Sequence, residues 1–475
     1  MKLKKGDLLT LTITDLAFGG ESVARTEDNL VVFVKGGLPG EEVRVQITRC
    51  KGRFVEGKVL EILHPSPFRV QARCKHFGPC GGCTWQDLYY PEQLKFKQKQ
   101  VQDALVRIGK LTDFSVNPMV GMSPEPWYYR NKMEYTFGYD EQGQLILGQH
   151  RSGHWDQLVD IETCWLQSPT SNKILNLCKE FARKHGLTAY SSKTHQGLLR
   201  HLVIREGKNT GEIMVNLVTS GEDFPQLPEL VQVLTSQVPE ITSMVLNVNR
   251  RIGETSQGQE EKVLWGRPTI REIINGLQFE ISANSFFQTN TRQAERLYRF
   301  VLNMAEVHEG SVVLDLYCGT GAIALHLAPR VKEVHGVEIN PIAVENARLN
   351  AQKNRIENVF FHCGEVKKVL RTLPFYPDLI VVDPPRDGLN RKVIQALVDK
   401  GPSQIIYVSC NPTTLARDLK DICEAGYKIS QIQPIDMFPH TFHIETVVSL
   451  VRCLSPVASH SSQPSTDNPQ RIMDH

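Results

Sequence analysis

The stretch "IIYVSCNPTTLARDL", residues 405–419, places a cysteine at the end of an apolar, β-branched run. The most common fate of a lone cysteine in an intracellular chain is burial in the core. The alternative is that Cys410 is a nucleophile exposed at a strand end. Pro412 restricts φ and disfavours helix at Asn411, so the chain turns sharply here. We expect a helix to follow, with Thr413 as its cap and with its positive end lowering the pKa of the Cys410 thiol.

A thiol in this position suits the methylation of carbon 5 of a pyrimidine. That carbon is a poor nucleophile, and a thiolate that adds to carbon 6 makes it enolate-like and able to accept a methyl group from a sulfonium. A base must then remove the carbon-5 proton so that the thiolate can be eliminated. Glu445, which starts the apolar stretch of "HIETVVSL", is the candidate base. Its alternative roles are a structural hydrogen-bond partner and a strand-edge charge.

Three other strands are expected to bring polar groups to the same edge. "VVLDLYCGTG" runs through Asp315 into a glycine-rich turn, "VHGVEIN" ends near Glu338, and "LIVVDPPRDGL" places Asp383 before a rigid Pro-Pro. Open α/β sheets bind their ligands at the carboxyl ends of their strands. The G-x-G-x-x-G spacing of a dinucleotide site is absent, and the layout is similar to that of class I methyltransferases, whose ligand is S-adenosylmethionine. Enzymes that methylate exocyclic nitrogens of bases have a strand that ends in an Asp-Pro-Pro-Tyr-like motif. Here Arg386 stands in place of the tyrosine.

Closely spaced cysteines form a second candidate site. "CKHFGPCGGC" contains Cys74, Cys80 and Cys83, and "IETCWLQSP" offers Cys164 as a fourth ligand. In a reduced compartment such cysteines are metal or cluster ligands rather than disulfides. Four thiolates suit zinc and also an iron-sulfur cluster; the spacing alone does not choose between them, and zinc, the more common of the two, leads at this point. Radical chemistry usually needs a different spacing and an open iron, which a fourth cysteine would close.

Length and composition limit the classes of protein. A chain of 475 residues predicts two to four domains. The 54 Lys and Arg nearly balance the 52 Asp and Glu, so any nucleic-acid surface must be local. The amino terminus lacks the apolar core of a signal peptide, and no stretch approaches the roughly 18 apolar residues of a membrane span. We therefore expect a cytoplasmic protein without a membrane partner.

The elements that must position these groups fall into four segments. Residues 1–63 alternate apolar and polar residues between glycine turns, which predicts an OB-like β-barrel. Residues 64–270 form a central α+β domain with the cysteine cluster, and residues 271–455 alternate apolar strands with amphipathic helices, which predicts a doubly wound, largely parallel α/β sheet. Residues 456–475 are polar and Ser/Pro-rich, as in a disordered tail.

Two pieces of the central segment mix aromatic, basic and amide side chains. They are "YYRNKMEYTFG", residues 128–138, and "GQHRSGHW", residues 148–155. Such a mixture suits stacking on bases and contact with phosphates. It is equally typical of an ordinary sheet surface, and both interpretations stay open.

Together the carboxyl-terminal motifs resemble the RNA uracil-5-methyltransferases, the family that contains the tRNA and large-subunit rRNA 5-methyluridine synthases. "SFFQTN", "DLYCGTG", "DPPRDG", "SCNPTTLARD" and "HIETV" stand in the family's order, and the amino-terminal barrel resembles the TRAM domain of many of these enzymes. The resemblance implies Cys410 as nucleophile and Glu445 as base. It also implies S-adenosylmethionine contacts from Gln288, Tyr317, Glu338 and Asp383.

The resemblance implies further expectations. Phe286 or Phe287 would border a uracil flipped out of its stack. One branch of the family carries a 4Fe-4S cluster on the four cysteine positions, which favours that cluster over zinc. We expect a monomer that methylates carbon 5 of a uridine in rRNA or tRNA, with rRNA ahead of tRNA. The alternatives are a nitrogen-directed nucleic-acid methyltransferase and a catalytically inactive, cluster-containing RNA-binding protein.

Overall fold

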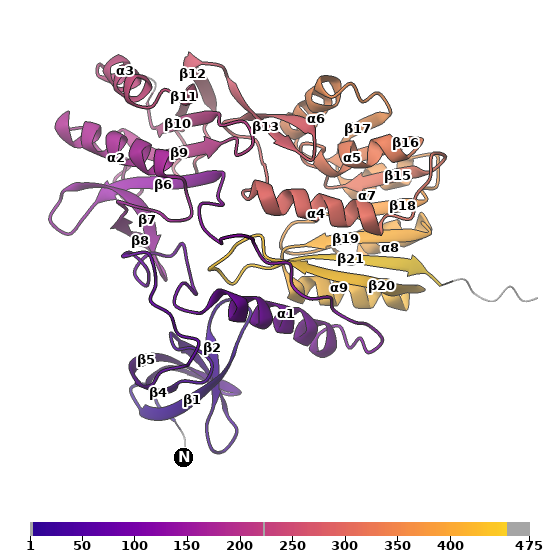
Figure 1. The fold of residues 1–475 in the computed structure, drawn as a ribbon, viewed down its shortest axis with the longest axis horizontal. Coiled ribbons are helices and arrows are strands. Elements are labelled where there is room, and N and C mark those ends of the chain that lie inside the picture. The colour runs from indigo at the N-terminus through magenta and orange to yellow at the C-terminus, as the bar shows by residue number, and fades with distance from the viewer. Residues whose placement is uncertain (1–2, 222–223, 454–475) are drawn as a thin grey trace, which may run out of the picture.

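The computed structural model describes residues 3–221 and 224–453. The predicted disordered tail, residues 456–475, lies outside the described residues. Figure 1 shows a small barrel at the amino-terminal end, a sheet with two helices in the middle of the sequence, and a second, larger α/β layer at the carboxyl-terminal end. The parts follow the predicted order, while the exact domain boundaries stay predictions. Among the described residues, no helix combines the length and apolarity needed to cross a membrane.

The amino-terminal strands close into a five-stranded barrel with the order β1-β2-β3-β5-β4. Their inward side chains, such as Ile13, Val32 and Val45, are almost completely buried, as the alternating sequence requires. The barrel confirms the predicted OB-like fold. The strands are β1 (Leu8–Leu16), β2 (Ser22–Arg25), β3 (Val31–Lys35), β4 (Glu42–Lys51) and β5 (Phe54–His64).

The central part is built on a seven-stranded sheet with the order β12-β11-β10-β9-β6-β7-β8. Only β10 and β11 pair in parallel among these strands. Helices α2 and α3 pack against the same side of the sheet (Figure 1) and share one apolar core with it. The strands are β6 (Lys132–Tyr139), β7 (Leu145–Arg151), β8 (His154–Asp160), β9 (Leu199–Glu206), β10 (Ile213–Thr219), β11 (Ile241–Val248) and β12 (Glu260–Gly266). The helices are α1 (Tyr90–Arg107), α2 (Pro169–Lys184) and α3 (Leu227–Gln237).

The carboxyl-terminal sheet also has seven strands, in the order β17-β16-β15-β18-β19-β21-β20. The strands from β17 to β19 are parallel, β21 pairs antiparallel with β19, and β20 pairs antiparallel with β21. This confirms the predicted doubly wound α/β fold. The strands are β15 (Val312–Leu316), β16 (Glu333–Glu338), β17 (Val359–Cys363), β18 (Leu379–Val382), β19 (Gln404–Ser409), β20 (Tyr427–Ile435) and β21 (Glu445–Arg452).

Helices cover both faces of this sheet, with one apolar core on each side. They are α4 (Thr291–Met304), α5 (Ala322–Leu327), α6 (Pro341–Lys353), α7 (Val366–Thr372), α8 (Arg391–Asp399) and α9 (Pro412–Glu424), with a 3-10 turn at Ala328–Arg330. The hairpin of β13 (Thr269–Ile274) and β14 (Leu277–Ser282) precedes the sheet, and its apolar residues join the core shared with α4.

Candidate functional site

The candidate site lies where the central strands of the carboxyl-terminal sheet end. Leu316 pairs with Val382, and Val382 pairs with Tyr407, so β15, β18 and β19 finish side by side. The residues that follow these strands are Tyr317, Asp383 and Cys410. Since β21 runs antiparallel to β19, with Ser409 opposite Thr446, its first residue, Glu445, begins at the same edge.

Cys410 is half-buried between β19 and α9. Burial raises the pKa of its thiol to about 11, and the negative charges of Glu445 and Asp383 add to that rise, while Arg386 opposes it. The predicted lowering of this pKa by the helix end was therefore wrong. The rise comes first from burial and then from two carboxylates in other parts of the sequence.

Two carboxyl groups share the site with the thiol. Burial holds the pKa of Glu445 well above its usual range, and the neighbouring Asp383 raises it further, while Arg386 opposes the rise. Burial also raises the pKa of Asp383, to about 7. The positive charge of Arg386 lowers the pKa of both Cys410 and Glu445. The site therefore contains a thiol, two carboxyl groups with raised pKa values and a guanidinium group.

The turn after Cys410 is fixed by Asn411. Its Oδ1 accepts a hydrogen bond from the Thr413 amide at 3.0 Å, and its Nδ2 donates to the Arg386 carbonyl at 3.1 Å. Asn411 is thus the N-cap of α9, and the prediction that Thr413 is the cap was wrong. The same side chain joins the loop after β18 to the residue next to the thiol.

The glycine-rich turn after β15 is shaped by two carboxylates. Glu338 Oε2 accepts a hydrogen bond from the Gly319 amide at 3.2 Å, and Asp315 Oδ2 accepts one from the Ala324 amide at 2.9 Å. Asp315 Oδ1 is buried and has no hydrogen-bond partner in the described part of the chain, and burial raises the pKa of Asp315 to about 8. Gly321 has φ +81°, and an added Cβ would lie 2.7 Å from the Phe361 ring.

Gln288 and the two candidate phenylalanines lie in the loop between β14 and α4. Phe287 is buried in the core against Phe279, with ring centroids 5.9 Å apart. Phe286 is 68% exposed and is the one of the two that is free to contact a ligand. The Gln288 carbonyl accepts a hydrogen bond from Asn131 Nδ2 at 2.8 Å.

The buried Arg205 of β9 also holds this loop through hydrogen bonds. One guanidinium nitrogen of Arg205 donates to the carbonyls of Ala283 and Ser285, at 3.1 and 2.6 Å. Asn131 lies in the stretch 128–138 that the sequence singled out for contact with bases and phosphates, but neither Asn131 nor Arg205 was linked to this loop, because no local pattern connects the central segment to it.

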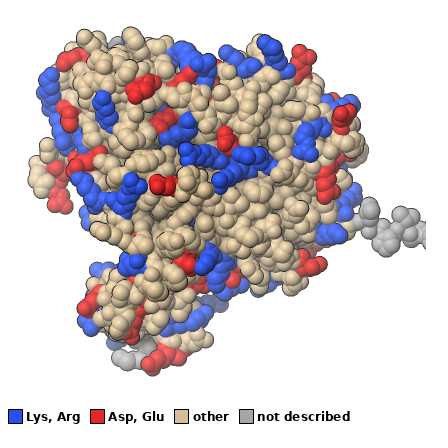
Figure 2. All heavy atoms as spheres, in the orientation of Figure 1, with Lys and Arg blue, Asp and Glu red and all other residues tan. Residues whose placement is uncertain are grey.

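A basic surface adjoins this loop. Figure 2 shows Lys and Arg side chains gathered across the middle of the visible face, over the position that α4 has in Figure 1. Helix α4 begins directly after the loop and carries Arg292, Arg296 and Arg299. The nearly neutral chain therefore has a local cationic surface beside this loop.

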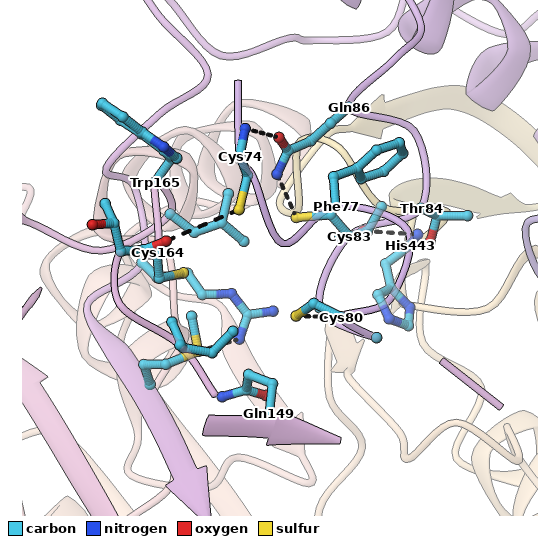
Figure 3. Close-up of a pocket in the computed structure, with 18 of the residues that line it drawn as sticks. Cys74, Phe77, Cys80, Cys83, Thr84, Gln86, Gln149, Cys164, Trp165 and His443 are labelled. Atoms are coloured by element: carbon cyan, nitrogen blue, oxygen red, sulfur yellow. Dashed lines mark hydrogen bonds between the residues drawn. The ribbon is translucent and has the colours of Figure 1, made fainter. Parts of the chain in front are cut away.

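The four predicted cluster cysteines line a single cavity of about 180 Å³. Figure 3 shows Cys74, Cys80, Cys83 and Cys164 around it, from two separate segments of the chain. Burial raises the pKa of Cys80 to about 11 and that of Cys83 to about 12. Within residues 3–221 and 224–453, no three Cys, His, Asp or Glu side chains lie close enough to hold one metal ion. Four thiols are the ligand type that an iron-sulfur cluster uses, but the described residues bring no three of them together as a metal-binding group, so the predicted cluster is not supported here.

The cysteine cavity contacts the segment that leads to Glu445. The amides of Thr84 and Trp85 both donate to the His440 carbonyl, at 2.8 and 3.0 Å. His443 also lines the cavity, and its Nδ1 lies 3.4 Å from a guanidinium nitrogen of Arg386 (Figure 3 shows His443 at the cavity rim). The segment that follows Cys83 therefore helps to fix the position of residues 440–444, which lead into β21.

Comparisons with known proteins agree with this geometry. The tRNA (Uracil-5-)-methyltransferase family model matches residues 245–364 and 366–453, and the TRAM domain model matches residues 2–60. An uncharacterized RNA methyltransferase of Halalkalibacterium halodurans is 42% identical over 456 residues, covering 94% of this chain and 98% of that protein. One from Clostridium acetobutylicum is 38% identical over 455 residues, covering 95% and 98%.

A solved structure extends the likeness to almost the whole fold. It is the Pyrococcus abyssi tRNA (uracil-54, C5)-methyltransferase in complex with S-adenosyl-L-homocysteine. The TM-score is 0.74 at 32% sequence identity, and the match covers 93% of this chain and 100% of that one.

Proposed function

The chain belongs to the RNA uracil-5-methyltransferase family and is an S-adenosylmethionine-dependent RNA methyltransferase, and we propose that Cys410 and Glu445 carry out its chemistry on carbon 5 of a uridine. One observation carries this proposal. A thiol and a buried carboxyl group, far apart in the sequence, meet at the ligand-binding edge of the sheet closely enough that each pKa responds to shared neighbours.

In this mechanism the Cys410 thiolate forms a bond to carbon 6 of the uracil, and the electron pair of the 5,6 double bond moves toward carbon 5. S-adenosylmethionine, when bound, supplies a methyl group on a cationic sulfonium. Carbon 5 takes that methyl group, and the Glu445 carboxylate then accepts the carbon-5 proton. The bond between carbon 6 and sulfur breaks, which restores the double bond and returns the thiolate.

The shifted pKa values suit this order of events. A thiol with a pKa of about 11 is mostly protonated at neutral pH, so the free protein is protected from stray alkylation. Arg386 favours the thiolate and therefore helps to form the nucleophile. A carboxylate with a raised pKa is also the stronger base.

We assign the cofactor to the strand ends around the glycine turn, with Gln288, Tyr317, Glu338 and Asp383 as its contacts. The support is the position of Tyr317, Glu338 and Asp383 at one edge of the sheet, together with the unpartnered, buried oxygen of Asp315, while Gln288 rests on the family resemblance alone. We also propose a 4Fe-4S cluster on Cys74, Cys80, Cys83 and Cys164. When bound it would link the two chain segments that line the cysteine cavity, and the thiols would have to lose their protons first.

An experiment must decide whether the substrate is rRNA or tRNA. The sequence predicts rRNA ahead of tRNA, whereas the Pyrococcus protein is named for tRNA. Anaerobically purified protein is incubated with methyl-labelled S-adenosylmethionine and total RNA from cells without such an enzyme. The RNAs are then separated and their nucleosides analysed by mass spectrometry. We expect the label in 5-methyluridine of one RNA class.

Cys410→Ala should abolish this label. Cys423→Ala is the matched control, because Cys423 is also half-buried with a pKa of about 11 but lies at the far end of α9. Label in a nitrogen-methylated base that survives Cys410→Ala would favour the nitrogen-directed alternative. Absence of label from an RNA-binding, cofactor-binding protein would contradict the proposed reaction.

A further inference from the structure

A second polar pocket lies on the central sheet, away from the strand ends of the carboxyl-terminal sheet. Its volume is about 340 Å³, within the range of about 300–1,000 Å³ typical of ligand sites. Thr136, His150, Trp155, Tyr190 and Arg200 are among its lining residues. Thr136, His150 and Trp155 come from the two sequence stretches with mixed aromatic and polar side chains, so the fold unites these stretches at one place.

Strand alternation explains which side of the sheet carries the pocket. Tyr135, Phe137 and Leu202 belong to the apolar core under α2 and α3. Side chains that alternate with them must project from the opposite face. Thr136 and His201 pair across β6 and β9, line the pocket, and lie 3.2 Å apart between Oγ1 and Nδ1. The pocket therefore opens on the face that does not contact these two helices.

Buried polar groups in this pocket lack partners. Arg200 is only 2% exposed, its ring partner Tyr190 lies 4.0 Å from the guanidinium carbon, and its terminal nitrogens donate to backbone carbonyls. Its Nε, and the Nδ1 of His150, have no hydrogen-bond partner among the residues described. Unsatisfied buried polar atoms require a partner such as water or a polar ligand.

The pocket's charge and shape narrow the choice of ligand. Its charged lining residues are two cations and two carboxylates, namely Lys193, Arg200, Asp156 and Glu254. A balanced set does not select a phosphate, but it suits a neutral ring with several donors and acceptors. Trp155, which is 69% exposed at the pocket's edge, offers a large aromatic surface for stacking.

The pocket shares a lining residue with a second pocket that reaches the loop between β14 and α4. Glu254 lines both this pocket and a neighbouring one of about 240 Å³, whose wall includes Arg205, Ala283 and Asn284. Asn284 is two residues before the exposed Phe286. We propose that the first pocket binds an unstacked base of the RNA substrate, a few nucleotides from the uridine that is methylated. This inference rests on the proposed function only for the identity of the ligand as RNA.

The test compares two exposed tryptophans on the same sheet. Trp155 belongs to β8 at one edge, and Trp265, which is 50% exposed, belongs to β12 at the other edge (Figure 1). Fluorescence anisotropy measures binding of unmodified tRNA transcripts and large-subunit rRNA fragments to both alanine variants. We expect Trp155→Ala to weaken RNA binding about tenfold, within the contribution of one base–aromatic stack, and Trp265→Ala to leave it unchanged. At saturating RNA, Trp155→Ala should keep the wild-type kcat.

A second measurement uses the wild-type protein. Transcripts containing 4-thiouridine are cross-linked by light, and the peptides are mapped by mass spectrometry. Cross-links on the Trp155 or Tyr190 peptides support the proposal. Equal affinities of the two tryptophan variants, together with no cross-link to either peptide, would overturn it. If wild-type protein binds RNA but makes no 5-methyluridine, the proposed reaction fails, and the affinity ratio of the two variants still decides the pocket.

Discussion

The molecule contains two seven-stranded sheets that position polar side chains in different ways. The carboxyl-terminal sheet is largely parallel, and helices cover both of its faces, so its polar groups collect at the ends of β15, β16, β18 and β19. The central sheet is largely antiparallel, and polar residues spread over the face opposite α2 and α3. The strand ends bring a few reactive groups close together, which suits the making and breaking of covalent bonds. A sheet face offers many separate contacts, which suits recognition of an extended RNA.

This comparison predicts the largest effects at the strand ends. In Glu445→Gln the carbon-5 proton has no acceptor, so we expect turnover to fall by about 10²- to 10⁴-fold. The protein–RNA adduct should accumulate, because the thiolate cannot be eliminated until that proton leaves. Denaturing gel electrophoresis with labelled RNA measures the adduct. Glu424→Gln, at the exposed end of α9, is the control and should turn over normally. Normal turnover of Glu445→Gln would remove Glu445 from the mechanism.

A substitution in the cysteine cavity tests whether residues outside the carboxyl-terminal sheet also affect the rate of methylation. In Cys83→Ser we expect the iron and sulfide content of anaerobically purified protein to fall to background. The Thr84 and Trp85 amides would then hold the His440 carbonyl less firmly. The residues between His440 and Glu445 would shift, and the Glu445 carboxyl group would move with them. A misplacement of about 1 Å can cost up to about a hundredfold in rate.

Cys178→Ser is the control for this prediction. Cys178 is a buried residue of α2 that does not line the cavity, so this variant should lose stability but hold as much iron as the wild-type protein. Full iron content in Cys83→Ser would contradict the proposed cluster.

The strand-end groups were the most predictable part of the site. Each of Cys410, Asp383 and Glu338 follows an apolar run that reveals its strand, and the fold class then brings the ends of parallel strands together. Arg205 and Asn131 had no such signal, because they act on a loop that is remote in the sequence. The two aromatic and polar stretches of the central sheet stayed undecided for the same reason. Their neighbours are set by strand order, which the sequence does not give.

The pKa of Cys410 shows a related limit. Local sequence revealed the helix after the thiol, and a helix N-terminus favours the thiolate. Burial and the charges of Glu445 and Asp383 instead raise the pKa, and these depend on tertiary structure. Sequence reasoning therefore missed the influences that set the direction of the shift.

The charge coupling at the strand ends can be measured directly. Since the Cys410 pKa is raised to about 11, its thiolate fraction, and hence its alkylation by iodoacetamide, should rise about tenfold per pH unit between pH 7 and pH 10. Arg386 favours the thiolate, so Arg386→Gln should raise this pKa further and slow alkylation several-fold, up to about tenfold for one unit. Peptide mapping by mass spectrometry follows Cys410 alone.

Arg391→Gln is the control for the alkylation experiment. Arg391 begins α8 and its side chain is 91% exposed, so its loss should leave the Cys410 rate unchanged. Equal slowing in both variants would mean that general electrostatics, rather than a strand-end contact, governs the thiol.

The smallest effect concerns the cap beside the nucleophile. Asn411 caps α9 and Asn390 caps α8, and each accepts a backbone amide at 3.0 Å. Replacing either by alanine should cost about 1 kcal/mol, which lowers the Tm of a domain of this size by about 2–4 °C. Only Asn411 also donates to the Arg386 carbonyl and adjoins Cys410. We therefore expect equal losses of Tm but a several-fold loss of kcat in Asn411→Ala alone. Equal kcat in the two variants would mean that the sheet by itself fixes the direction of the thiol, without help from the helix cap.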